Sequence, residues 1–250
     1  MVGRETGGDV VASDGRASAT GELATEEPLK VQRFPNLTEQ AYHLLRQEIL
    51  SRRLRAGDRL VERTLGDRYR LSKTPIREAI ARLERDGLVV IVPSQGAVVR
   101  RLALGEVKDL LECRQALDAF AARRAAERIQ REDVVELEQM LVAAERERVN
   151  GSPERYREHD AAFHARIREM ASNATLLRVM ESLESQVRLV MTSTTGLPGR
   201  VGASMEEHRR ILEALRAKDP DAAALAASEH VARMLEAVEE YWPVIERGDI

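Results

Sequence analysis

The sequence predicts a mainly α-helical protein in two parts: three helices with a short β-hairpin, then an all-α helical bundle. Three observations support this fold class. Ala, Leu, Arg and Glu dominate the 250 residues, whereas aromatic residues make up only 3%, a composition that favours helices over strands. Apolar residues recur at helical spacing through most of the chain after residue 36. Paired strands are indicated at residues 88–99, where β-branched runs flank a turn.

Charge and composition divide the chain into three segments. Residues 1–35 are rich in Gly, Ser, Ala, Thr and acidic residues without a hydrophobic period, which predicts a disordered leader. Residues 36–102 carry 14 Lys and Arg against 8 Asp and Glu, whereas residues 103–250 carry 21 against 28. We therefore expect a basic domain at 36–102, of the kind that binds a polyanion, and an acidic helical domain at 103–245. Chance variation in surface charge would give the same asymmetry, so charge alone leaves both interpretations open.

The basic segment predicts a winged helix-turn-helix. Its first helix is expected to begin at the N-cap Thr38, and its second helix covers residues 62–69. The third helix follows the N-cap Ser72 and ends at Gly87, since glycine is the usual residue just after a helix. Residues 88–99 then supply two strands around a turn.

A winged helix-turn-helix binds DNA by placing the start of its third helix in the major groove. The residues expected to face DNA are Arg63 on the second helix, Ser72, Lys73, Thr74 and Arg77 on the third, and Gln95 and Gly96 at the hairpin tip. Lys and Arg suit guanine or phosphate, hydroxyl groups reach phosphate or base edges, and Gly96 permits close approach. A solvated, Arg-rich face in an ordinary domain is the alternative. The hairpin and the short turn between the second and third helices favour DNA binding.

The acidic segment predicts six helices and no strand. They are expected at residues 104–128, 131–149, 153–171, 174–195, 202–217 and 219–241. Six amphipathic helices in one segment predict a bundle. The single cysteine, Cys113, excludes an internal disulfide and is consistent with a reducing cytoplasm. No apolar run approaches the roughly 20 residues of a membrane span, so we expect a cytoplasmic protein without a membrane partner.

Four residues of the acidic segment are candidate metal ligands. Asp160 and His164 lie four apart in a helical pattern, so both side chains face the same side. His208 and His230 each lie near the edge of the apolar face of a later helix. One carboxylate and three imidazoles would suit Zn²⁺, with Ni²⁺, Mn²⁺ and Fe²⁺ as alternatives. For any one histidine, a separate surface or hydrogen-bonded role is the competing interpretation, and His159 is expected to face solvent.

One long motif carries a family resemblance. The run A-G-D-R-L-V-E-R-T-L-G-D-R-Y-R-L-S-K-T-P-I-R-E-A-I-A-R-L-E-R-D-G-L-V at 56–89, followed by G-A-V-V at 96–99, resembles the DNA-binding domain of GntR-family transcription regulators. The acidic segment resembles the FCD effector domain of their FadR-type subfamily. Lys73 stands where the family usually has Arg, so bidentate base contact is lost at that position.

The resemblance also implies a ligand set. In FCD regulators that bind metal, D-x3-H is followed by a His in a later helix and a His in the last helix. This pattern falls on Asp160, His164, His208 and His230. It further implies that Arg114 faces the pocket, where its guanidinium would pair with an effector carboxylate. A surface ion pair with Asp118, four residues on, is the alternative role for Arg114.

The function implied is that of a DNA-binding transcription regulator, expected to be a repressor and not an enzyme. It would bind a palindromic operator as a homodimer, and a small organic acid bound at the metal-containing domain would change operator affinity. A metal-dependent hydrolase or lyase acting on a carboxylate is one alternative, although the sequence has no H-E-x-x-H, G-x-S-x-G or Gly-rich phosphate motif. A DNA-binding dimer with a purely structural metal is the other.

Overall fold

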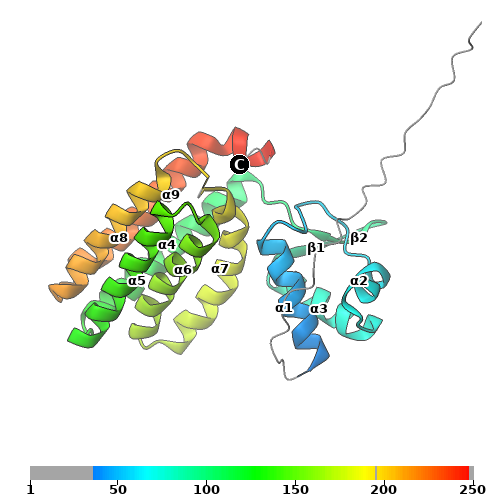
Figure 1. Ribbon diagram of the computed structural model, residues 1–250, viewed down its shortest axis with the longest axis horizontal. Helices are drawn as coiled ribbons and strands as arrows, with labels where there is room; N and C mark the ends of the chain where they lie inside the picture. The colour runs from blue at the N-terminus through cyan, green and yellow to red at the C-terminus, as the bar shows by residue number, and fades with distance from the viewer. Residues whose placement is uncertain (1–35, 195, 248–250) are drawn as a thin grey trace, which may run out of the picture. The chain divides into compact units, whose positions relative to one another are not determined.

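The computed structural model describes residues 36–194 and 196–247, with the exception of the side chains of residues 190–194 and 247. The described chain is mainly helical, with helices α1 to α9 and a two-stranded sheet (Figure 1). This confirms the predicted fold class. The leader predicted at residues 1–35 lies outside the described residues.

The first part of the described chain is a winged helix-turn-helix. Its elements are α1 (Leu37–Leu50), α2 (Glu62–Tyr69), α3 (Lys73–Arg85), β1 (Val89–Val92) and β2 (Gly96–Val99). The two strands pair antiparallel, with Val89 opposite Val99 and Val92 opposite Gly96. A core of buried apolar side chains joins the three helices to the sheet, and it includes the predicted stripe of α3: Ile76, Ala79, Ile80 and Leu83.

The start of α1 differs from the prediction. Asn36 is the N-cap, and its side chain accepts a hydrogen bond from the backbone nitrogen of Glu39 at 2.8 Å. Thr38 instead lies inside the first turn, and its hydroxyl donates to Glu78 of α3 at 2.7 Å. Asn is at least as good an N-cap as Thr, so the local sequence did not distinguish the two positions.

The turn between α2 and α3 is tight. Gly66 accepts a hydrogen bond from the backbone nitrogen of Leu71 at 3.0 Å, and Arg70 adopts a left-handed conformation with φ 56°. A Cβ atom at Gly66 would lie 2.8 Å from the carbonyl oxygen of Leu71, so a side chain there would push α2 and the turn apart. This close approach fixes the angle at which α3 follows α2.

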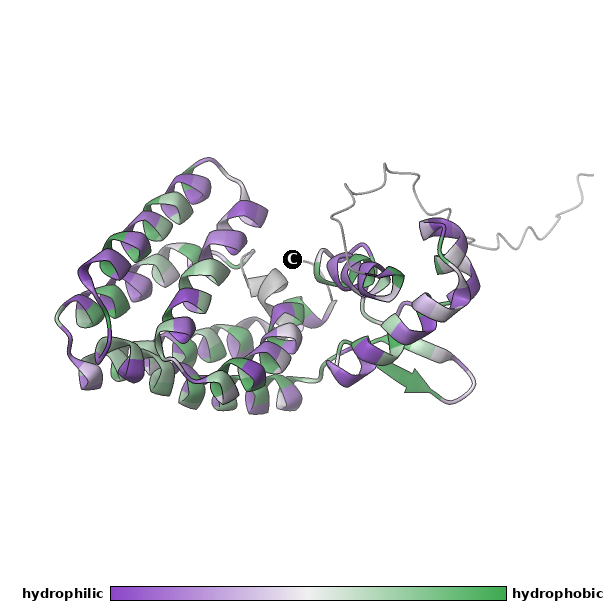
Figure 2. Cartoon of the chain, turned by 90° about the horizontal axis from the view of Figure 1, so that it is seen from below, coloured by the Kyte–Doolittle hydropathy of each residue, from purple (hydrophilic) through white to green (hydrophobic). Residues whose placement is uncertain are grey.

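The remaining helices form the predicted bundle. They are α4 (Leu104–Ala126), α5 (Arg131–Val149), α6 (Pro153–Met170), α7 (Ala174–Thr194), α8 (Arg200–Arg216) and α9 (Pro220–Arg247). α4 packs against α6, α7, α8 and α9, and α5 packs against α6 and α8. Hydrophobic and hydrophilic residues alternate along these helices (Figure 2), as expected for helices that bury one face. α9 continues six residues past the predicted end at 241.

Within residues 36–194 and 196–247, none of the helices combines the length and the apolar character that spanning a bilayer requires.

Candidate functional site

The residues predicted to face DNA lie on the surface of the winged helix-turn-helix. Lys73 opens α3, whereas Ile76 and Leu83 on the opposite side of that helix are buried. α3 therefore presents its polar N-terminal residues outward while its apolar stripe packs inward. All seven candidates are exposed: Arg63, Ser72, Lys73, Thr74, Arg77, Gln95 and Gly96.

Arg77 is oriented by an ion pair with α2. Its Nε and Nη2 atoms donate to the two carboxylate oxygens of Glu62 at 2.8 and 2.9 Å. Hydrogen bonding from Arg77 lowers the pKa of Glu62 below its usual range. The Arg77 side chain nevertheless remains 69% exposed. Glu62 therefore orients the guanidinium group while leaving it accessible to a phosphate or a base. Sequence reasoning missed Glu62, because 15 residues separate the two side chains.

The hairpin tip is tied to the segment that precedes α2. Arg59 Nε donates to the carbonyl oxygen of Gln95 at 3.0 Å, and Arg59 also forms an isolated β-bridge with Val98. Gly96 has a φ of +81°, which glycine adopts without strain. Arg59 thus adds an exposed cation at the wing. No local signal could have identified it, since 36 residues separate it from Gln95.

Three histidines from three helices meet in the interior of the bundle. His164 lies in α6, His208 in α8 and His230 in α9, and one ring nitrogen from each lies within 4.8 Å of the other two. His164 Nε2 and His208 Nε2 are 3.1 Å apart, a spacing that two nitrogens can adopt around one ion at about 2.1 Å. All three side chains are buried. This triad could hold a metal ion.

A carboxylate orients His230. Its Nδ1 lies 2.7 Å from Glu207 Oε2, and Arg200 donates to both oxygens of Glu207 at 3.1 and 2.9 Å. The other ring nitrogen, Nε2, is buried without a partner among the described residues. A carboxylate that fixes one nitrogen and leaves the other available is the usual arrangement behind a metal-ligating histidine. The donor set therefore fits a metal ion.

Asp160 lies at the edge of this cluster. Its Oδ1 is 3.6 Å from His208 Nε2, which is long for a hydrogen bond but near enough for both atoms to reach one ion. Burial raises the pKa of the Asp160 carboxyl, while the charges of His230 and Arg114 act in the opposite direction. A divalent cation would stabilise the ionised carboxylate in this environment.

Burial keeps two of the histidines neutral. It lowers the pKa of His164 and of His208 well below the ordinary value, and the charges of His230 and Arg114 lower both further. A neutral imidazole has a lone pair available for a metal without first losing a proton.

Two buried arginines share one carboxylate beside the histidines. Arg114 Nε donates to one oxygen of Asp118 at 3.0 Å, and Arg168 Nε donates to the other at 2.9 Å. Arg168 Nη1 also donates to Glu184 at 3.0 Å. The Arg114 and Arg168 side chains are 6% and 3% exposed. Arg114 is therefore buried, as expected of a residue that faces the pocket. It is also paired with Asp118, as expected in the alternative role.

The two guanidinium groups decide the ionisation of Asp118. Burial by itself would raise the pKa of this carboxyl, but the charges of Arg168 and Arg114 lower it below its usual range. Arg168 was not predicted from the sequence. Its spacing is a usable signal, because it lies four residues after His164 and eight after Asp160 on the same face of α6.

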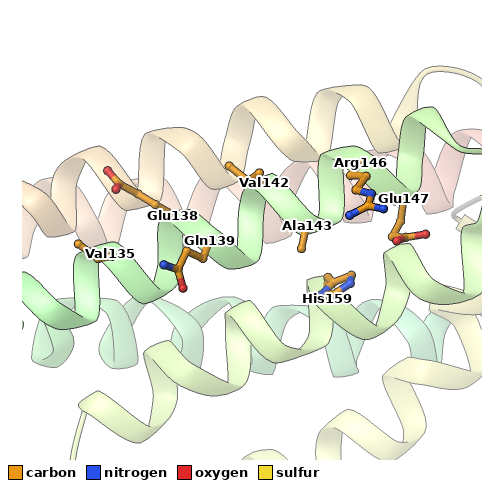
Figure 3. Close-up of a pocket in the computed structure, with 8 residues that line it drawn as sticks. All are labelled: Val135, Glu138, Gln139, Val142, Ala143, Arg146, Glu147 and His159. Atoms are coloured by element: carbon orange, nitrogen blue, oxygen red, sulfur yellow. The ribbon is translucent and has the colours of Figure 1, made fainter.

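A groove is lined by residues of α5 and α6 (Figure 3), none of which belongs to these clusters. It has a volume of about 620 Å³ and is lined by one side of α5, including Val135, Val142 and Arg146, and by His159 of α6. His159 thus lies away from the histidine triad, at an open surface. In the described part of the chain, no cluster with metal-ligand spacing includes His159.

Comparison with known families identifies the class of protein. Residues 37–99 match the family described as bacterial regulatory proteins, gntR family, and residues 109–233 match the FCD domain. The chain belongs to the GntR family of bacterial transcription regulators that carry an FCD domain. Members of this class bind DNA through the N-terminal domain and a small-molecule effector through the FCD domain, and the chain is a regulator rather than an enzyme.

Individual relatives agree with this assignment. The HTH-type transcriptional repressor RspR of Escherichia coli (strain K12) is 28% identical over 208 residues, covering 82% of this chain and 90% of RspR. The Uxu operon regulator of Haemophilus influenzae is 28% identical over 218 residues, covering 78% and 81%. The solved structure of E. coli McbR/YncC has a TM-score of 0.74 at 21% identity, covering 84% of this chain and all of that one. This last likeness shows the fold alone.

Proposed function

We propose that this chain is a cytoplasmic repressor that binds a palindromic operator as a homodimer. The observation that carries the proposal is the exposed N-terminal end of α3, where Lys73 and Arg77 project from a helix whose other face is buried. Two copies related by a two-fold axis would read two half-sites in successive major grooves. The relative named as a repressor, RspR, supports this sign of regulation.

Each candidate on the DNA-binding face has a distinct role. Lys73 and Arg77 contact base edges, and the hydroxyl groups of Ser72 and Thr74 contact phosphate or base. Arg63 binds a phosphate, and the wing tip at 95–96 lies along the backbone or in the minor groove. Because Lys is a point charge, Arg77 supplies the forked donor geometry.

In the FCD domain, a divalent transition metal binds to four ligands: Asp160, His164, His208 and His230. Zn²⁺ suits neutral imidazoles with one carboxylate best, and Ni²⁺, Mn²⁺ and Fe²⁺ are the alternatives. The unpartnered Nε2 of His230 and the spacing of the histidine triad support this assignment. When bound, the ion supplies a Lewis-acidic position that attracts a carboxylate oxygen.

The effector is a small organic acid whose carboxylate pairs with Arg114. In the described part of the chain, Arg114 makes its one hydrogen bond through Nε, to Asp118. Its two terminal nitrogens keep their forked donors for a ligand, and forked pairing with a carboxylate is the strongest contact that arginine makes. Asp118 fixes the direction of the guanidinium, so the Arg114 side chain loses little conformational entropy when the ligand binds.

Helix α7 offers a route from the effector cluster to the DNA-binding domain. Glu184 of α7 accepts a hydrogen bond from Arg168, and the next residue, Ser185, accepts one from Arg46 of α1 at 3.2 Å. Gln186 accepts another from Arg100 at 3.1 Å. An effector that binds one arrangement of these contacts more tightly than another raises the population of protein molecules in that arrangement. Operator affinity then changes by linkage.

A thermal-shift screen of small carboxylates on the metal-loaded protein tests the effector proposal. A bound acid should raise Tm, and Arg114→Ala should remove the increase. The hits are then added to an operator-binding assay. An effector that raises Tm without changing operator affinity would contradict the proposed mechanism, and a screen without hits would contradict the ligand class.

A further inference from the structure

We infer that Arg168 is a second anion-binding residue of the effector pocket, so that the effector is an acid with two anionic groups. One group binds at Arg114 and the metal position, and the other binds at Arg168. This inference rests on the proposed effector function, and it narrows the ligand from a carboxylate to a dianion such as a dicarboxylate.

The first support is an unused donor. A guanidinium group carries five N–H donors; in Arg168, Nε donates to Asp118 and Nη1 donates to Glu184. Nη2 is buried, since the Arg168 side chain is only 3% exposed. It has no hydrogen-bond partner among the described residues. Buried charged donors almost always have an acceptor, because leaving one unpaired is costly. The described residues therefore supply no acceptor for Nη2.

The second support is position. Asp160, His164 and Arg168 are spaced by four residues on α6 and lie on one face of the helix. Arg114 and Arg168 donate to the two oxygens of Asp118, so their guanidinium groups lie at one carboxylate. Arg168 thus lies beside Arg114 and one helical turn after His164.

A water molecule is the alternative hydrogen-bond acceptor for Nη2 of Arg168. A water molecule would satisfy its hydrogen bonds but would not offset the charge. A carboxylate does both, and its two oxygens can accept from Nη2 in a charge-assisted contact. The two occupants differ in a measurable way, because only a carboxylate makes affinity depend on the number of acidic groups in the ligand.

Isothermal titration calorimetry with matched acids separates these cases. Succinate and butyrate both have four carbons but carry two and one carboxylates, and malonate and glutarate test the spacing between the groups. The metal-loaded wild-type protein should bind the best-fitting dicarboxylate about 10-fold or more tighter than the monocarboxylate, as expected for one added charged hydrogen bond. Equal affinities at every chain length would overturn the inference.

Arg168→Lys is the matched variant. Lysine keeps the charge beside Asp118 but has no second terminal nitrogen, so the preference for the dicarboxylate should fall close to one while butyrate affinity is kept. Arg166→Lys is the control, since Arg166 lies two residues away on the outer side of α6, paired with Asp133 and Glu136. It should keep the wild-type preference.

The outcomes distinguish this inference from the proposed function. If no dicarboxylate binds more tightly than butyrate, or if Arg168→Lys keeps the preference, the effector is a carboxylate but Arg168 has no part in its recognition. If neither acid class binds, the proposed effector function fails and the inference fails with it. Should Arg168→Lys not fold, Glu184→Gln provides a second variant, which removes one carboxylate charge that competes for Arg168 and should strengthen dicarboxylate binding. In either case, the affinities of the wild-type protein for the dicarboxylates and for butyrate test the inference directly.

Discussion

The two domains of this regulator treat charge in opposite ways. On the winged helix-turn-helix, the cations assigned to DNA are in water, and the Arg77 side chain is 69% exposed although it is paired with Glu62. In the FCD domain, Arg114 and Arg168 are 6% and 3% exposed and share one carboxylate. Exposed pairs are weak and exchange readily, whereas buried pairs are coupled and depend on every partner.

The difference matches the two ligands. DNA presents a long row of charges and its own counterions, so a domain that binds it needs cations that can leave weak internal partners. A small acid presents one or two charges and must be distinguished from many others. Such a ligand requires a closed site in which each donor is already aimed.

The largest effect is expected from removing both base-reading cations. Lys73→Ala with Arg77→Ala should abolish specific operator binding, a loss of about 100-fold or more, since each good base contact contributes about 1–3 kcal/mol of discrimination. An electrophoretic mobility-shift assay measures it. Arg209→Ala, which removes an exposed cation of α8, is the control. Specific binding that survives in the double variant would refute the recognition-helix assignment.

Breaking the histidine triad should empty the metal site without affecting the DNA-binding face. His208→Ala with His230→Ala removes two of the three imidazoles, and metal content measured by mass spectrometry of the purified protein should fall to background. His159→Ala, at the outer groove, should leave the metal content unchanged. Retention of the metal in the double variant would show that the ion binds elsewhere.

Gly66→Ala should destabilise the winged helix-turn-helix. The new Cβ would lie 2.8 Å from the Leu71 carbonyl oxygen, and such overpacking costs about 1–3 kcal/mol in free energy of unfolding. Urea denaturation followed by circular dichroism measures the change. Gly105→Ala in α4 is the matched control, because no described atom lies within 4 Å of its Cβ position. Equal stability of the two variants would mean that the turn between α2 and α3 can relax.

The smallest effect is expected from a single phosphate contact. Arg63→Ala should weaken binding to specific and non-specific DNA alike, and it should reduce the slope of log affinity against log salt by about 0.9. Fluorescence anisotropy over a salt series measures both. Metal content should not respond to salt over the same range, because buried groups are little screened. A variant that loses specific binding alone would identify Arg63 as a base-reading residue instead.

The fold class and most of the candidate residues could be predicted from the amino-acid sequence. Helical spacing located the stripe of α3 from Ile76 to Leu83, and β-branched runs located the hairpin, because both patterns are local. The i and i+4 spacing of Asp160 and His164 also placed two candidate ligands on one helical face. The prediction of Thr38 as N-cap was wrong, because Asn36 is equally acceptable by local sequence. In the structure Asn36 accepts from the backbone nitrogen of Glu39, and Thr38 donates to Glu78 of α3.

Which distant residues meet depends on how the helices pack. His208 and His230 join His164 because α8 and α9 pack beside α6, and Glu207 orients His230 across that interface. Arg168 becomes a candidate effector-binding residue because Asp118 and Glu184 accept from two of its nitrogens, while Nη2 has no partner among the described residues. Periodicity shows which face a side chain occupies, but the partners across the core depend on helix packing, which no local pattern specifies.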